Sequence, residues 1–276
     1  MNTSHEATIR DQFTRQAAGF AAAPELHNEA IHALMIDAAQ PRASDRMPDI
    51  ACGPGSVVVA FAPYVARAVG VDTTPAMLTQ ARALQESQGL INIDWQLGDA
   101  YTLPFAAGSF DIVTNRFAFH HLEHIQAAFA EMLRVAAPGT RVMVCDGLAS
   151  DDPAKAAAFN AMERWRDPST VEFRTVSVLR ALFTAAGLGT PHETLFRVPS
   201  RASAMVASAF PARDDRAGLL ALIEDSVADD RLAMHARREG SDVMLNYSAA
   251  GLCAVKPAWR SCAAMPLAMT CRPIVW

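Results

Sequence analysis

The sequence lacks the features typical of membrane-bound, exported or nucleic-acid-binding proteins. No uncharged apolar stretch reaches the roughly 18 residues of a membrane span. The first 15 residues alternate polar, charged and apolar side chains, unlike the apolar core of a signal peptide. Basic residues form no long run and number 24 against 29 acidic ones, which disfavours a nucleic acid held through its phosphates.

Cysteines are few and scattered. None of the five forms a C-x-x-C pair, the spacing typical of zinc and redox sites. An odd, dispersed set predicts reduced thiols in a cytoplasmic protein. The composition does provide a core, because 51% of the residues are hydrophobic, and the 276-residue length suits one large α/β domain or a core domain with a cap.

Hydrophobic periodicity predicts the organisation of the chain. Residues 1–45 carry apolar side chains at helical spacing and are expected to form a helical cap segment. Residues 46–257 alternate short apolar runs with helical segments, which predicts an open, mostly parallel α/β sheet with helices on both faces. The expected strands cover residues 49–52, 68–72, 91–97, 110–115 and 141–146.

The later part of the sequence is less regular. We expect a helical insertion near residues 200–238 and a strand over 243–255 that closes the edge of the sheet. Residues 258–276 change composition abruptly and are predicted to form an irregular tail. Pro48 lacks a backbone donor, so the start of the first strand is expected to fray.

The strongest local motif is Asp49-Ile-Ala-Cys-Gly-Pro-Gly-Ser56, at the junction of the first strand and its helix. Gly53 and Gly55 allow backbone conformations that other residues avoid and a close approach of ligand to main chain. A dinucleotide-binding loop would need a small residue at position 58, where this chain has the bulky Val58. The loop therefore favours a ligand with a small carboxylate and amine over a pyrophosphate.

Two further acids end predicted strands, at the sheet edge where open α/β proteins bind ligands. Asp72 suits the hydroxyls of a ribose, although it could instead cap the next helix. Met77 follows at a position that can touch an adenine face, although a methionine at helical spacing is more often core. Asp99 could accept a hydrogen bond from an adenine amine, with Ala100 beside the ring.

These motifs, with Gly70-Val-Asp72, Leu103-Pro-Phe105 and Phe110-Asp-Ile-Val113, resemble the ordered motifs of class I S-adenosylmethionine (SAM)-dependent methyltransferases, most closely the UbiE-like small-molecule subgroup. The resemblance implies a seven-stranded Rossmann-like sheet, SAM as cofactor and S-adenosyl-L-homocysteine as product. It implies that Asp49, Gly53 and Gly55 shape the methionine pocket, that Asp72 holds the ribose, and that Met77, Asp99 and Ala100 surround the adenine. Asn115 and Arg116 would line the sulfonium end through main-chain groups.

A histidine-rich segment follows the fourth predicted strand. His120 and His124 could share a helix face with Glu123 nearby, but no cysteine lies close and we expect no metal site. In the structural interpretation, the imidazoles only satisfy backbone groups. In the functional interpretation, His121 is the first candidate for a general base and His120 the second, because histidine titrates near neutral pH. His27 is a third, more speculative candidate.

The sequence thus predicts an enzyme that transfers a methyl group from SAM to a small, hydrophobic or aromatic molecule at an undetermined C, O or N atom. The alternatives are a nicotinamide-dependent oxidoreductase, disfavoured by Val58, by Asp99 and by the lack of a Tyr-x-x-x-Lys pair, and a non-catalytic SAM-binding protein. We expect a monomer or homodimer whose partner is the small-molecule acceptor. Candidate residues for the acceptor pocket are Phe13, Phe20, Phe159, Met162, Trp165 and Phe173.

Overall fold

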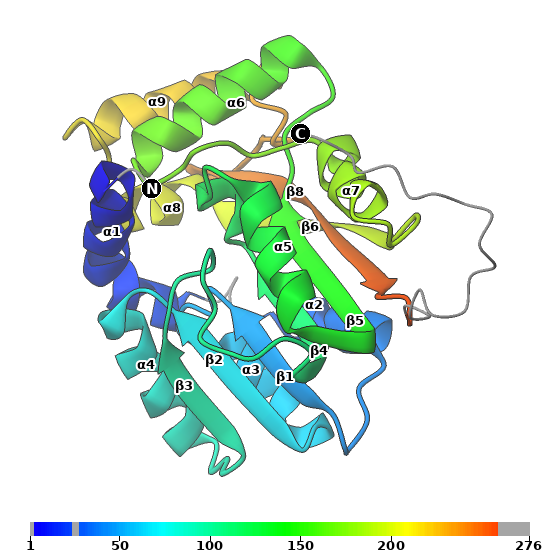
Figure 1. Ribbon diagram of the computed structural model, residues 1–276. Helices are drawn as coiled ribbons and strands as arrows, with labels where there is room; N and C mark the ends of the chain where they lie inside the picture. Colours follow the sequence, from blue (N-terminus) through cyan, green and yellow to red (C-terminus); the bar gives the residue numbers. More distant parts are fainter. Residues whose placement is uncertain (1–2, 24–27, 259–276) are drawn as a thin grey trace, which may run out of the picture.

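The protein is described by a computed structural model, which covers residues 3–23 and 28–258. Its centre is an eight-stranded sheet with the order β3-β2-β1-β4-β5-β8-β6, in which β7 pairs with β8 beside this path (Figure 1). The strands are β1 (Arg46–Ile50), β2 (Arg67–Asp72), β3 (Ile93–Leu97), β4 (Phe110–Arg116), β5 (Ala136–Gly147), β6 (His192–Arg201), β7 (Arg237–Glu239) and β8 (Asp242–Val255).

The sheet is open and mostly parallel, as the sequence predicts. Strands β1 to β5 pair in parallel, whereas β8 runs antiparallel to both of its neighbours, β5 and β6. The chain order reverses between β1 and β4, since β2 and β3 lie on one side of β1 and β5 lies beyond β4. Such a reversal leaves a crevice at the carboxyl ends of the strands, which is the usual ligand site of open α/β sheets.

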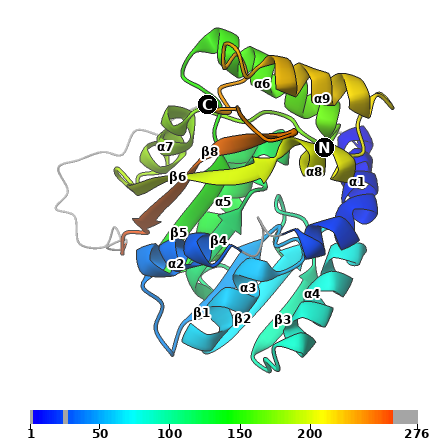
Figure 2. The same ribbon diagram turned by 180° about the vertical axis from the view of Figure 1, so that it is seen from behind.

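Helices cover both faces of the sheet (Figures 1 and 2). One face packs against α2 (Glu29–Ala39), α3 (Ser56–Phe61) and α4 (Pro75–Ser87), and the other against α5 (Ile125–Val135) and α7 (Val176–Ala185). The helices α6 (Pro153–Arg166), α8 (Ala202–Ser208) and α9 (Arg216–Asp225) pack with part of β8 into a third cluster. The long helix α1 (Thr3–Ala22) contacts α4.

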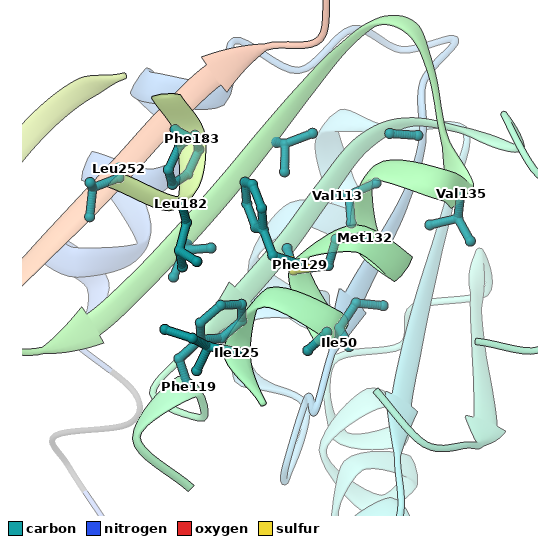
Figure 3. Packing of buried hydrophobic residues seen from close by; sticks show 14 of the residues in the cluster. Ile50, Val113, Phe119, Ile125, Phe129, Met132, Val135, Leu182, Phe183 and Leu252 are labelled. Carbon is teal, nitrogen blue, oxygen red and sulfur yellow. The ribbon is translucent and has the colours of Figure 1, made fainter. Parts of the chain in front are cut away.

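Helix α5 packs on the sheet through a buried apolar face. Figure 3 shows Ile125, Phe129 and Met132 of α5 facing Val113 of the sheet, with Phe183 of α7 alongside. These five side chains are all at most 3% exposed. The spacing of Ile125, Phe129 and Met132 places them on one face of α5. Burial of that face holds the start of the helix, and with it the preceding segment that carries the histidines.

Two local expectations are wrong. The strand over 243–255 is not the edge of the sheet, because β6 pairs with its outer side; β6 escaped prediction because it is largely polar, as an exposed edge strand can be. Pro48 does not fray β1, since it is buried and in register with Val69. Helix α3 ends at Phe61, and the chain continues as a short 3₁₀ turn containing Pro63.

The segment 200–238 contains α8 and α9, with the short strand β7 and turns making up the rest. Residues 259–276 of the predicted tail and His27 lie outside the described residues. Within the described part of the chain, no helix is long and apolar enough to cross a membrane.

Candidate functional site

A cavity lies at the carboxyl ends of the parallel strands, at the point where the strand order reverses. Its floor includes Asp49 and the glycine loop after β1, Asp72 after β2, and Arg116 at the end of β4. Helix α1 closes it from the side with Ile9, Phe13 and Phe20, together with His5 and Glu6. Residues 117–124 complete the wall between these two sets, apart from buried Phe119 and His120.

Asp72 is bound on both oxygens by the backbone of the loops around it. Its Oδ2 accepts the N–H of Gly53 at 2.8 Å and its Oδ1 accepts the N–H of Thr74 at 2.8 Å. Burial raises the pKa of Asp72, and the hydrogen bonds from Thr74 and Gly53 oppose that shift. Asp72 is not the cap of α4, because the N-cap is Thr74 and Asp72 binds the N–H of Thr74 itself, in the turn before the helix. The Asp72 side chain lines the cavity.

The two glycines of the loop have different tasks. Gly53 has a φ of +53° and a Cβ there would meet nothing within 4 Å, so its main chain faces open space in the cavity wall. Gly55, with a φ of +85°, is not among the lining residues; a Cβ there would lie 2.5 Å from the ring of Trp95. The ring of Trp95 also covers Gly70 and donates from Nε1 to Gln85 at 2.6 Å. Gly55 therefore shapes the loop from behind.

Asp49 is the most deeply buried acid of the site, at 1% exposure. Burial raises its pKa to about 7, against the hydrogen bond that Thr114 donates at 2.7 Å and the charge of Arg116. Arg116 itself donates to the hydroxyl of Ser56 at 2.8 Å and is 8% exposed. A carboxyl group in this state gains its charge readily when a cationic group binds beside it.

The third acid lies at the rim. Asp99 is half-buried and accepts the N–H of Tyr101 at 2.9 Å, which fixes the turn after β3. Asp99, Ala100 and Met77 all line the cavity, as the sequence suggests. Asn115 does not: its side chain donates to the carbonyl of Ile50 at 2.6 Å and ties β4 to β1.

Two residues that the sequence gives no reason to single out are held in the left-handed region. Ala51 and Phe117 both have a φ of 54°, and they follow the adjacent strands β1 and β4. Both line the cavity. Residues with a Cβ rarely adopt this backbone conformation. Such outliers concentrate at binding sites, where the surrounding fold enforces them.

The two adjacent histidines have separate environments. His121 lines the cavity, with its ring against the edge of Phe13 at a centroid distance of 4.9 Å. His120 lies behind it, stacked on Phe173 at 4.1 Å, and its Nδ1 is 2.7 Å from Oδ1 of Asp146. Burial and the charge of His120 lower the pKa of His121 to about 3, so that His121 is neutral near pH 7.

The histidine segment does not form one helix. His120 belongs to a 3₁₀ turn (Phe119–His121), and His124 precedes α5 as its N-cap, so they do not share a helix face. Among the described residues, no group of three or more His, Cys, Asp or Glu side chains could hold a metal ion.

The acceptor candidates divide between two places. Phe13 and Phe20 line the cavity. The other four pack in the third hydrophobic cluster, and ordinary core packing accounts for them: Phe159, Met162, Trp165 and Phe173. The sequence cannot distinguish a pocket-lining role from core packing, because both require buried apolar side chains.

Comparison with known proteins agrees with this geometry. Residues 48–144 match the family model described as a methyltransferase domain. The uncharacterized methyltransferase YcgJ of Bacillus subtilis is 39% identical over 152 residues, which are 55% of this chain and 60% of that protein. The ubiquinone/menaquinone biosynthesis C-methyltransferase UbiE of Dinoroseobacter shibae is 34% identical over 160 residues, 55% of this chain and 64% of that protein. The matched region thus spans less than two thirds of either relative.

The fold is shared over a greater length. The crystal structure of YcgJ from B. subtilis superposes with a TM-score of 0.74 at 28% identity, covering 84% of this chain and all of that one. Residues 48–144 are thus similar to methyltransferase domains, and the sheet is shared with the structure of the methyltransferase YcgJ.

Proposed function

We propose that the protein transfers a methyl group from SAM to a small, uncharged, apolar molecule with an aromatic ring. The observation that carries this proposal is the single cavity that joins the three strand-end acids Asp49, Asp72 and Asp99 to an apolar wall under α1. One half of such a cavity suits a polar nucleoside-linked amino acid, and the other suits a hydrophobic acceptor.

The residues of the polar half fit SAM. Gly53 leaves its main chain open to the cavity, and the ready ionisation of Asp49 suits the ammonium group of the methionine end. Asp72 would accept hydrogen bonds from the ribose hydroxyls, while Met77, Asp99 and Ala100 would surround the adenine. Arg116 and the main chain after β4 would lie at the sulfonium end. When bound, SAM supplies an electrophilic methyl group.

The apolar half limits the acceptor. Ile9, Phe13, Phe20, Phe117 and Leu122 line it. Arg116 is the one Lys or Arg among the lining residues described, and Ser56 engages it at the polar end. The described lining of the apolar half therefore offers no lysine or arginine to pair with the phosphate or diphosphate of an acceptor. A ring of the kind implied by the name of the UbiE relative, a quinone precursor, matches the lining better.

His121 is the proposed general base. Its ring lines the apolar half, where it can meet a hydroxyl or an acidic carbon of the acceptor. Burial lowers the pKa of His121 and so weakens it as a base, and the negative charge of Asp167 opposes that shift. His120 is set back against Phe173 and Asp146 and would support His121 instead of contacting the acceptor. The close packing of the wall would exclude water and orient the acceptor, which methyl transfer chiefly requires.

Calorimetry with SAM, S-adenosyl-L-homocysteine and NAD tests the cofactor. We expect both SAM and S-adenosyl-L-homocysteine to bind and NAD not to bind; binding of NAD alone would overturn the proposal.

Transfer of labelled methyl from SAM to a panel of hydroquinones and phenols then tests the activity, and SAM binding without transfer to any of them would favour the non-catalytic alternative. His121→Ala should abolish most turnover while SAM binding is retained; unchanged turnover would remove His121 as the base.

A further inference from the structure

A chain of polar side chains supports His121 on the side away from the cavity. Asp167 and Ser169, from the loop between α6 and α7, are 1% and 0% exposed. The hydroxyl of Ser169 donates to Oδ1 of Asp167 at 2.5 Å, and the N–H of Ser169 donates to the same oxygen at 2.9 Å. Nδ1 of His121 lies 3.1 Å from the Ser169 hydroxyl and 3.1 Å from its carbonyl oxygen.

These contacts determine which ring nitrogen of His121 carries the proton. A carbonyl oxygen can only accept a hydrogen bond. The Ser169 hydroxyl has one hydrogen, which the charge-assisted bond to Asp167 occupies, so towards His121 the hydroxyl also acts as an acceptor. With two acceptors facing it, Nδ1 must be the protonated nitrogen. Nε2 of the neutral ring then keeps its lone pair.

We propose that Asp167 and Ser169 are positioning residues, which fix His121 as the tautomer whose Nε2 accepts a proton from the methyl acceptor. This inference rests on the proposed function. In the step it serves, the electron pair of the acceptor's X–H bond forms the new bond to the methyl carbon, and the pair of the broken methyl–sulfur bond stays on sulfur. The proton passes to Nε2, and the resulting imidazolium keeps its Nδ1–H on Ser169 and within reach of the negative charge of Asp167.

Asp167 also binds helix α1, which covers the cavity. Gln16 of α1, 3% exposed, donates to Oδ2 of Asp167 at 3.2 Å, and Nε2 of His5 lies 2.9 Å from the carbonyl oxygen of His121. Helix α1 also supplies Phe13, which packs on the His121 ring. The position of α1 and the orientation of the base are therefore linked through Asp167.

The neighbouring pair of His120 and Asp146 differs in a way that supports this assignment. There a carboxylate binds the imidazole directly, at 2.7 Å, but His120 does not line the cavity. The hydroxyl of Ser169 extends the reach of Asp167 to the imidazole that does line it.

The first test is the tautomer itself. Long-range ¹H–¹⁵N correlation spectra of the full chain labelled in histidine, assigned with the His121→Ala variant, should show a protonated Nδ1 and an unprotonated Nε2 for His121 at pH 7. The opposite tautomer would overturn the inference whether or not SAM binds. Failure of SAM binding in calorimetry would instead overturn the proposed function, so the two failures are distinguishable.

The second test is kinetic. Asp167→Asn keeps an acceptor for Ser169 but removes the charge, and we expect kcat to fall about tenfold while KM for SAM and affinity for S-adenosyl-L-homocysteine stay within about twofold. Asp152→Asn, an exposed N-cap at the start of α6, is the matched control and should leave kcat unchanged. Wild-type kcat in Asp167→Asn, or a loss of cofactor affinity equal to the loss of kcat, would assign Asp167 a structural role only.

Discussion

The two walls of the cavity are built in different ways. The cofactor wall, as we call the polar half proposed to bind SAM, takes its acids from the ends of three neighbouring strands. Backbone N–H groups fix Asp72 and Asp99 in the loops that follow. The acceptor wall, as we call the apolar half proposed to bind the methyl acceptor, consists of helix α1 and residues 117–124. Its residue His121 contacts Ser169, which binds Asp167, and both belong to a loop distant in the chain. One wall is made by local turns at a sheet edge, and the other by contacts between segments far apart in the chain. We therefore expect substitutions in the two walls to affect different measurements.

The largest effect should come from Asp72→Asn. This variant keeps the size of the side chain but removes the charge that would hold both ribose hydroxyls, and charge-assisted hydrogen bonds of this kind are worth about 1.5–3 kcal/mol. We expect the Kd for SAM in calorimetry to rise about 100-fold. Asp94→Asn, an exposed carboxylate on β3, is the control and should leave the Kd unchanged. A change of less than about threefold in Asp72→Asn would show that the cofactor wall does not depend on this acid.

Gly70→Ala tests whether the Trp95 ring, which packs behind the glycine loop, can move. A Cβ at this position would lie 2.3 Å from the Trp95 ring, and the same ring supports Gly55. Overpacking of this kind costs about 2 kcal/mol, measured as the free energy of unfolding in urea. Gly251→Ala on β8 offers a matched strand glycine with nothing within 4 Å of the added carbon, and we expect a much smaller loss. Equal losses in the two variants would mean that Trp95 moves freely.

Phe13→Ala should separate the two walls. The variant removes a ring that contacts His121 and lines the apolar half, so we expect KM for the acceptor to rise about tenfold, which corresponds to about 1.4 kcal/mol. Affinity for S-adenosyl-L-homocysteine should stay the same. Val178→Ala, an exposed apolar residue of α7, serves as the control. Equal weakening of acceptor and cofactor would indicate that α1 orders the whole cavity.

The last prediction concerns the pH dependence of stability. Asp49 in the folded protein keeps its proton up to about pH 7, because burial raises its pKa, whereas the unfolded chain releases it near the ordinary value of 3.8. The folded state then binds more protons between these values, so this group lowers the free energy of unfolding as pH rises from about 4 to about 7. Asp49→Asn removes that contribution. In urea unfolding, the wild type should lose stability relative to the variant across this range, and parallel curves would contradict the raised pKa.

The meeting of the three acids at one cavity could be predicted from the sequence for a physical reason. Carboxyl ends of parallel strands meet at one sheet edge, so acids that end successive strands converge whatever the rest of the fold does. Asp49, Asp72 and Asp99 follow this rule. Ala51 and Phe117 were missed because positive φ values at residues with a Cβ leave no mark in composition or periodicity.

Prediction was weaker where a residue's partners come from elsewhere. The segment around His121 could be placed near the ligand edge, but which of the two histidines faces the cavity depends on Asp146 and Phe173 on one side and Ser169 on the other. Aromatic residues of α6 were expected at the acceptor because a buried ring in a pocket and a buried ring in a core have the same sequence pattern.

The sequence by itself determined the alternation of strands and helices through β5, the glycine loop and the row of acids, because each depends on a few consecutive residues and on the fixed direction of parallel strands. Only the tertiary structure decided that β6 forms the edge, that α1 covers the cavity, and that His121 is held through Ser169 by Asp167. These features join segments separated by many residues, and no local periodicity encodes such contacts, since they arise only when the apolar faces of the helices pack on the finished sheet.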